Sequence, residues 1–175
     1  IGIFLTLIYF IFSQFLSPMP LMLIIVISEF LFTGGLHADG LMDTSDGLFS
    51  GREREKKLEI MKDSRVGSFG VVAFVFIILL KWQLLAAIPT PEFIPIILVM
   101  MPLMSRYTLI LSIRSYPYAR KSGMGQAFAV YAPKHVITWS TISTFCMPII
   151  ICLLLSLLYA IALGITSILS IPFIP

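Results

Sequence analysis

The chain has 175 residues, of which 58% are hydrophobic and 12% charged, and its formal net charge is +3. Soluble domains carry about 25% charged residues, so this composition excludes an ordinary soluble domain and predicts a single all-α domain that crosses a membrane several times. The two cysteines, Cys146 and Cys152, lie in one apolar run, without the spacing of a zinc site or of a secreted disulfide framework.

Apolar segments follow one another along the chain, and a membrane-spanning helix needs roughly 20 mainly apolar residues. We expect an integral membrane bundle of about six helices, at residues 1–16, 20–33, 69–88, 93–113, 136–156 and 158–175. Prolines in SPMP at 17–20 and in PTPE at 89–92 favour turns, because proline breaks helices and disfavours helix just before it. The last two spans form one apolar run, and we expect its turn at residues 159–164.

Two polar segments, residues 34–68 and 114–135, hold most of the charged residues. Two spans separate them, so both lie on one side of the membrane, and the turns on the other side contain no Lys or Arg. The positive-inside rule then places both segments at the cytoplasmic face of the cell membrane. The bases of the first segment alternate with acids, and the bases form no stripe, which excludes nucleic acid as a partner. The bases are Arg52, Arg54, Lys56, Lys57, Lys62 and Arg65 in the first segment, and Arg114, Arg120, Lys121 and Lys134 in the second.

Three aspartates in GGLHADGLMDTSDGLFSG, residues 34–51, are spaced i, i+4, i+7. On a helix this spacing puts Asp39, Asp43 and Asp46 on one face, where their charges repel one another unless a cation or a proton is shared. Mg²⁺ takes carboxylate oxygens and keeps water and substrate phosphates as further ligands. We therefore expect these aspartates to bind Mg²⁺. The alternative is a solvated acidic loop, which the glycines of the segment also fit.

Other polar residues supply candidates for a phosphate site. His37 could be a general base or a phosphate contact, or else a hydrogen-bonded structural residue. In MKDSRVGSFG, residues 61–70, Lys62 and Arg65 form a candidate diphosphate clamp, with Asp63 as a further metal ligand or a base. Helix-flanking anchors are the alternative reading of this segment.

The second half of the chain adds two candidate substrate-binding bases. Arg106 falls inside the fourth span and should face the bundle interior or the interface. Arg120, followed by Gly123 and Gly125, could close over a phosphate. Glu29 and Lys81 also lie in apolar spans, and the sequence assigns neither a role. Together the residues predict phosphoryl-group chemistry at the inner membrane face.

The long motif resembles that of the cobalamin 5'-phosphate synthase family, also called adenosylcobinamide-GDP ribazoletransferase. Its pattern is similar to G-G-x-H-x-D-G-x-x-D-x-x-D-G, then a basic stretch, then I-M-[KR]-D-S-R-x-G. The YAR and GMG of residues 118–125 resemble the family too. The long pattern is matched by Gly34, Gly35, His37, Asp39, Gly40, Asp43, Asp46, Gly47, Ile60, Met61, Lys62, Asp63, Ser64, Arg65 and Gly67.

The resemblance implies an integral membrane enzyme at the end of the nucleotide-loop branch of vitamin B12 assembly. It implies a Mg²⁺-dependent transferase that joins adenosylcobinamide-GDP to α-ribazole or α-ribazole 5'-phosphate and releases GMP. The lipid bilayer is the other expected partner, and the oligomeric state stays open.

Alternatives remain open at this point. The chain starts in an apolar segment without Met and lacks the family's G-G-x-T-G-D-x-x-G-A stretch, so a truncated or inactive relative is one alternative. A CDP-alcohol phosphotransferase also uses clustered aspartates, but its D-G-x-x-A-R pattern fails after Asp39 and Gly40. A transporter or metal-binding membrane subunit would need acids deep in several spans.

Overall fold

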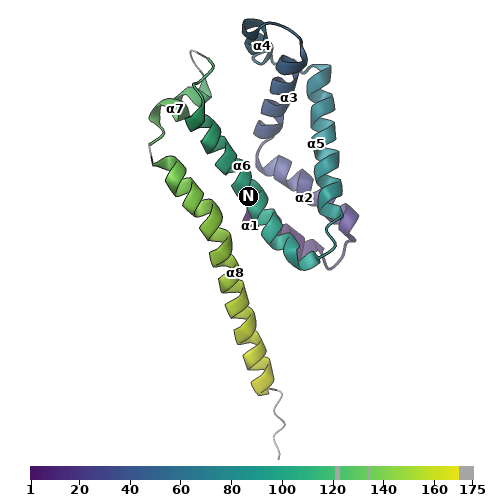
Figure 1. Ribbon diagram of the computed structural model, residues 1–175. Helices are drawn as coiled ribbons and strands as arrows, with labels where there is room; N and C mark the ends of the chain where they lie inside the picture. The colour runs from purple at the N-terminus through teal and green to yellow at the C-terminus, as the bar shows by residue number, and fades with distance from the viewer. Residues whose placement is uncertain (121–122, 134, 170–175) are drawn as a thin grey trace, which may run out of the picture. The chain divides into compact units, whose positions relative to one another are not determined.

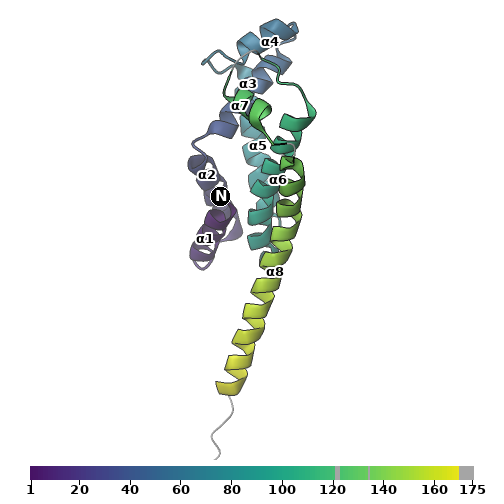
Figure 2. The same cartoon turned by 90° about the vertical axis from the view of Figure 1, so that its left-hand side faces the viewer.

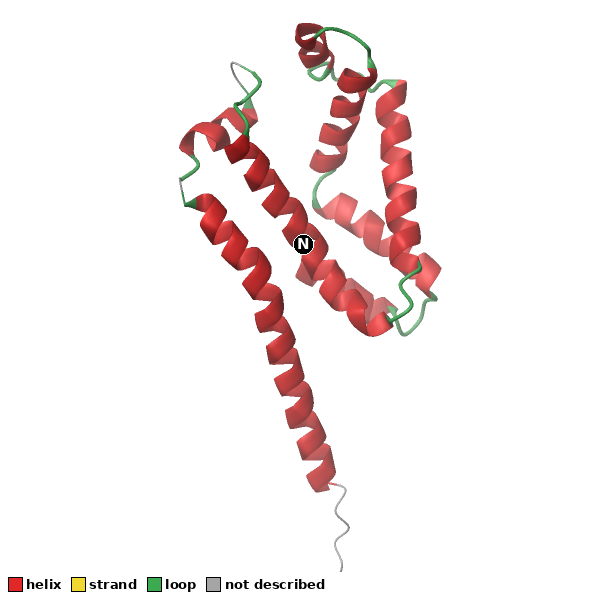
Figure 3. Cartoon of the chain, in the orientation of Figure 1, coloured by secondary structure: helices red, strands yellow, loops and turns green. Residues whose placement is uncertain are grey.

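The computed structural model describes residues 1–120, 123–133 and 135–169. Every regular element in these residues is a helix, as Figure 3 shows, which confirms the all-α class. The chain forms two compact units, Ile1–Val99 and Met100–Pro175. The helices are α1 (Gly2–Phe12), α2 (Pro18–Phe32), α3 (Leu36–Phe49), α4 (Arg54–Ile60), α5 (Ser68–Ala86), the 3-10 turn η1 (Pro91–Phe93), α6 (Ile94–Ser115), α7 (Met124–Tyr131) and α8 (Val136–Leu169).

Three helical segments of the described chain are long and apolar enough to cross a membrane: Ser68–Ala86, Pro91–Ser115 and Val136–Leu154. They agree with the predicted spans at 69–88, 93–113 and 136–156. A fourth span exists only if α2 and α3 count as one bent segment. The expected number of about six is therefore not confirmed. Helix α1 is a shorter apolar helix of 11 residues.

The acidic segment is a helix, so the alternative of a solvated loop is wrong. Helices α2 and α3 meet at 87° and together reach spanning length, as a broken span or a re-entrant loop would. The bend lies at Gly34 and Gly35, whose φ angles of 61° and 73° are in the left-handed region that favours glycine. Helix α2 has only 15 residues, about 22 Å of rise, so it does not fill a bilayer core alone.

Within the first unit, α5 packs against both α3 and α2, and α1 packs against α2. Figures 1 and 2 both show α3 beside the first half of α5, with α4 at the end of this pair. The Trp82 indole N–H donates to the Met19 carbonyl at 2.8 Å, and the Phe30 and Phe74 rings lie 5.7 Å apart. Most other large apolar side chains of α5 remain exposed, as expected for a surface that faces lipid. The buried apolar core residues are Leu5, Leu21, Met22, Ile25, Val26, Leu85, Ile94 and Leu98.

In the second unit, α8 continues from Val136 to Leu169 as one helix of 34 residues. The predicted turn at residues 159–164 is wrong, because a lone glycine costs a helix only about 1 kcal/mol and no proline falls in that stretch. The end of the predicted span 158–175 lies outside the described residues. Thr141 Oγ1 donates to the Tyr107 hydroxyl at 3.1 Å, and the Tyr107 and Phe145 rings are 5.9 Å apart, which joins α6 to α8.

Candidate active site

The acidic face of α3, defined as Asp39, Asp43 and Asp46, forms as the spacing predicts. Asp39 is exposed in the first turn, where its negative charge is favourable near the helix N-terminus. Asp43 and Asp46 follow at one-turn intervals and are each partly buried. The three aspartates therefore share a helix face but have different environments.

Asp46 is bound at both carboxylate oxygens by backbone amides of another helix. The Gly67 N–H donates to its Oδ2 at 2.7 Å, and the Gly70 N–H donates to its Oδ1 at 2.8 Å. Gly67 is the N-cap residue of α5, so Asp46 satisfies two amides that have no partner within that helix. The carboxylate also lies at the positive end of the α5 dipole. Asp46 thus caps α5 from a position 21 residues earlier in the chain.

The two glycines are required by this close approach. A Cβ atom added at Gly70 would lie 2.5 Å from Asp46 Oδ2 and 2.9 Å from the Met42 carbonyl oxygen, and one added at Gly67 would overlap Asp46 Oδ1. A side chain at Gly70 would also push against the α3 backbone at Met42, and one at Gly67 would displace the Asp46 carboxylate. The spacing Gly67-x-x-Gly70 therefore belongs to the contact between these helices.

The loop between α4 and α5, residues 61–67, is called the basic loop here because it carries Lys62 and Arg65. Its first residue, Met61, packs on α3 at Gly47, where an added Cβ would lie 2.6 Å from Met61 Cε and 3.1 Å from the Lys57 carbonyl oxygen. Its last residue, Gly67, binds Asp46. Both ends of the basic loop are therefore held on adjacent residues of α3.

Within the basic loop, Arg65 and Asp63 bind each other. Arg65 Nη2 donates to Asp63 Oδ2 at 2.6 Å, Arg65 Nε donates to Oδ1 at 3.0 Å, and the Arg65 backbone N–H donates to Oδ1 at 3.1 Å. The hydrogen bonds from the Arg65 side chain and backbone lower the pKa of Asp63 from 3.8 to about 2. A carboxylate this acidic is a weak base at neutral pH. The guanidinium stays accessible, since 87% of the Arg65 side chain is exposed.

Mg²⁺ binding by α3 remains a prediction. Among the residues that the structure describes, no group of three or more His, Cys, Asp and Glu side chains is arranged to hold a metal ion. Asp39 and Asp43 still offer hard oxygen ligands one turn apart, and Mg²⁺ is commonly held by one or two carboxylates with phosphate and water as its other ligands. The donor chemistry therefore fits Mg²⁺ in the presence of a phosphate substrate.

A cavity of about 140 Å³ lies inside the bend, between α2, α3 and α5. His37 and Thr33 line it, and so do Glu29 and Lys81, which form an ion pair across α2 and α5. Sequence reasoning assigned Glu29 and Lys81 no role, and missed that each is the other's partner. Opposite charges in two neighbouring apolar spans were the signal that could have found the pair.

The second unit holds the other two predicted site residues. Arg106 on α6 and Arg120 after it are both partly buried. The Tyr118 ring closes on Gly123 and Gly125, where an added Cβ would lie 2.5 Å from its hydroxyl and 2.9 Å from its Cε2 respectively. Lys121 and Lys134 are outside the described residues. A part for Arg106 and Arg120 in binding substrate stays a prediction.

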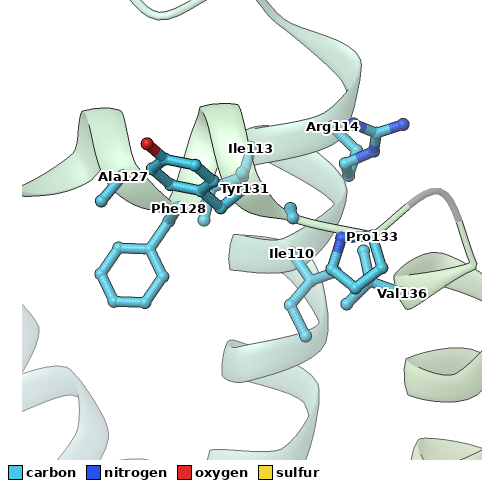
Figure 4. Close-up of a pocket in the computed structure, with 9 residues that line it drawn as sticks. Ile110, Ile113, Arg114, Ala127, Phe128, Tyr131, Pro133 and Val136 are labelled. Carbon is cyan, nitrogen blue, oxygen red and sulfur yellow. The ribbon is translucent and has the colours of Figure 1, made fainter.

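A second cavity, of about 270 Å³, lies within this unit between α6, α7 and α8. Figure 4 shows Phe128 and Tyr131 of α7 beside Ile110, Ile113 and Val136, with Arg114 at the edge. Its lining is almost wholly apolar. None of the predicted site residues lines it.

Comparison with known proteins finds a protein family that matches this chain. A family model described as cobalamin-5-phosphate synthase matches residues 1–173. A relative from Acetivibrio thermocellus is 36% identical over 174 residues, which cover 99% of this chain and 70% of the relative. A relative from Desulfitobacterium hafniense (strain Y51) is 43% identical over 114 residues, covering 63% of this chain and 44% of the relative. Both relatives are named adenosylcobinamide-GDP ribazoletransferase.

The matches with the relatives differ in extent. A third relative of the same name, from Desulforamulus reducens, is 52% identical over 91 residues, which cover 52% of this chain and 36% of the relative. The chain thus spans about half the length of the curated relatives it matches. No solved structure matches.

Proposed function

We propose, because the chain belongs to the cobalamin-5-phosphate synthase family, that it is the ribazole-transferring enzyme its relatives are named for. The substrates are adenosylcobinamide-GDP and α-ribazole or α-ribazole 5'-phosphate, and GMP is the leaving product. The observation that carries the proposal is the docking of the basic loop on the helix that bears the acidic face. Asp46 of the acidic face and the segment that carries Lys62 and Arg65 thereby meet in one contact.

The reaction breaks the phosphoanhydride bond of the diphosphate and forms a new phosphoester bond. A ribazole hydroxyl oxygen forms a bond to the phosphorus next to the cobinamide, the bond from that phosphorus to the GMP oxygen breaks, and the hydroxyl loses its proton. Negative charge grows on the leaving GMP oxygen and on the oxygens of the transferred phosphoryl group. Cationic groups that bind those oxygens more tightly in the transition state lower the barrier.

Six of the predicted site residues have a role in this proposal. Lys62 and Arg65 bind diphosphate oxygens, and the fixed fork of Arg65 suits two of them at once. Asp39 and Asp43 would hold Mg²⁺, which would supply positive charge to neutralise the diphosphate. His37, exposed in the first turn of α3, is a candidate to accept the hydroxyl proton. Because its low pKa makes Asp63 a weak base, its proposed role is to orient Arg65.

The orientation proposed for the site is cytoplasmic, in the cell membrane. The spanning helices agree with a membrane protein. Lys and Arg are concentrated in the segments 34–68 and 114–135 and missing from the turns at 17–20 and 89–92. This asymmetry is the support for the orientation.

The test is release of GMP by the purified, detergent-solubilised chain given adenosylcobinamide-GDP, α-ribazole 5'-phosphate and Mg²⁺. We expect release that stops when EDTA removes the metal and that requires the ribazole compound. Asp43→Asn should lose it, while Thr44→Ser, an exposed neighbour on the same helix, should keep it. Folded wild-type chain that releases no GMP would contradict the proposal.

A further inference from the structure

The contact between the basic loop and α3 rests on two consecutive residues, Asp46 and Gly47. Asp46 binds the amides of Gly67 and Gly70, and Gly47 leaves room for Met61. Met61 and Gly67 are the two ends of the basic loop. A single dipeptide of α3 therefore contacts both ends of the segment that carries Lys62, Asp63 and Arg65.

Asp46 is bound by protein at both of its carboxylate oxygens. Each of its oxygens already accepts an amide hydrogen bond of 2.7 or 2.8 Å, and its charge is balanced by the N-terminus of α5. Asp39 is exposed in the first turn of α3, and about 10 Å of helix rise separates it from Asp46. The acidic face thus has an exposed residue, Asp39, at its start and a residue whose two oxygens are occupied by protein, Asp46, at its end.

We propose that Asp46 is a positioning residue and not a metal ligand: its cap on α5 holds the basic loop against the second half of α3, the helix that carries Asp39 and Asp43. The proposal rests on the proposed function for the chemistry that this placement serves. With the cap intact, the backbone that carries Lys62 and Arg65 is held in one position before these residues bind a diphosphate. Without it, both glycine amides lose their acceptor, and the loop keeps only its Met61 end.

The first arm of the test needs no substrate. Backbone hydrogen exchange is followed by mass spectrometry across residues 62–71 in wild type, Asp46→Asn, Gly70→Ala and the double variant. Asparagine can accept only one of the two amide bonds, and alanine at 70 displaces the carboxylate from the other side. We expect exchange to rise roughly tenfold in both single variants. Ser68→Ala, exposed in the same turn of α5, is the matched control and should exchange as wild type does.

The second arm measures GMP release per folded molecule as Mg²⁺ is varied. Asp46→Asn and Gly70→Ala should each lower kcat by about 100-fold while the half-saturating Mg²⁺ concentration stays at its wild-type value. Because both break one contact, the double variant should be no slower than either single variant. Asp43→Asn should instead raise the half-saturating Mg²⁺ concentration. A loss of fold alone would lower the amount of active protein and leave kcat per folded molecule unchanged.

Two results would overturn the proposal. One is Asp46→Asn with unchanged exchange over residues 62–71. The other is Asp46→Asn with a raised Mg²⁺ requirement beside Gly70→Ala with normal kinetics, which would make Asp46 a ligand. Wild-type protein that releases no GMP refutes the proposed function, and the exchange arm then still decides whether Asp46 holds the basic loop.

Discussion

Lys81 on α5 donates a hydrogen bond to the carboxylate of Glu29 on α2, and the two residues are 52 positions apart in the chain. Both side chains are mostly covered, with 26% of Lys81 and 19% of Glu29 exposed. Within apolar helices each charge needs the other, because an isolated ion in a low-dielectric surrounding is costly. The pair therefore joins α2 to α5 beneath the bend that leads into the acidic face.

Breaking this pair from one side should destabilise the first unit. Lys81→Met leaves the Glu29 carboxylate without its cation, and we expect a loss of about 3 kcal/mol in the free energy of unfolding. The double variant Glu29→Gln with Lys81→Met should recover most of that loss, since neither charge remains. Denaturation in mixed micelles, followed by tryptophan fluorescence, gives both values. Equal losses in the single and double variants would argue against the pair.

Asp43→Asn should lower GMP release by about 100-fold or more, because it removes a carboxylate proposed to hold the metal at the transferring phosphate. The deficit should shrink when Mg²⁺ is raised well above the wild-type requirement. Thr44→Ser, in the next position on α3, serves as the control. A normal Mg²⁺ dependence in the Asp43→Asn variant would contradict a role for Asp43 in metal binding.

Asp63 should not determine the acid side of the pH–rate profile. The hydrogen bonds from Arg65 lower the pKa of Asp63 from 3.8 to about 2. The stability that its ionised form contributes is therefore fully present above pH 3.8 and is lost only as the pH falls through about 2. Between pH 5 and 9 it does not titrate. We expect Asp63→Asn to keep the shape of the profile of kcat against pH. Disappearance of the acid limb in this variant would restore Asp63 as a base.

Arg65→Ala should act mainly on diphosphate binding. Each hydrogen bond between charged groups is worth about 1.5–3 kcal/mol, so losing the guanidinium should raise KM for adenosylcobinamide-GDP by roughly 10- to 100-fold. Arg52→Ala, an exposed base before α4, is a matched change of charge outside the basic loop and should leave KM unchanged. Initial rates of GMP release over a range of substrate concentration give both constants. Similar KM values for the two variants would contradict a special role for Arg65.

Much of the site was predictable from local patterns. The i, i+4, i+7 spacing of Asp39, Asp43 and Asp46 places them on one face of any helix, and α3 has that face. The apolar lengths gave α5 and α6 close to their observed bounds. The turn predicted at residues 159–164 was wrong, because it was inferred only from the length of the apolar run, which is enough for two spans. No residue in that stretch stops a helix.

The sequence by itself determined that the acids lie together on one helix and that bases follow them on a short loop, because both properties depend on neighbours within a few residues. Only the tertiary structure decided what each acid binds. Asp46 lies 21 and 24 residues before the amides it caps, and Glu29 lies 52 residues before Lys81. Such partners are set by how α3 and α2 pack against α5, and no local periodicity encodes a contact between helices that are distant in the chain.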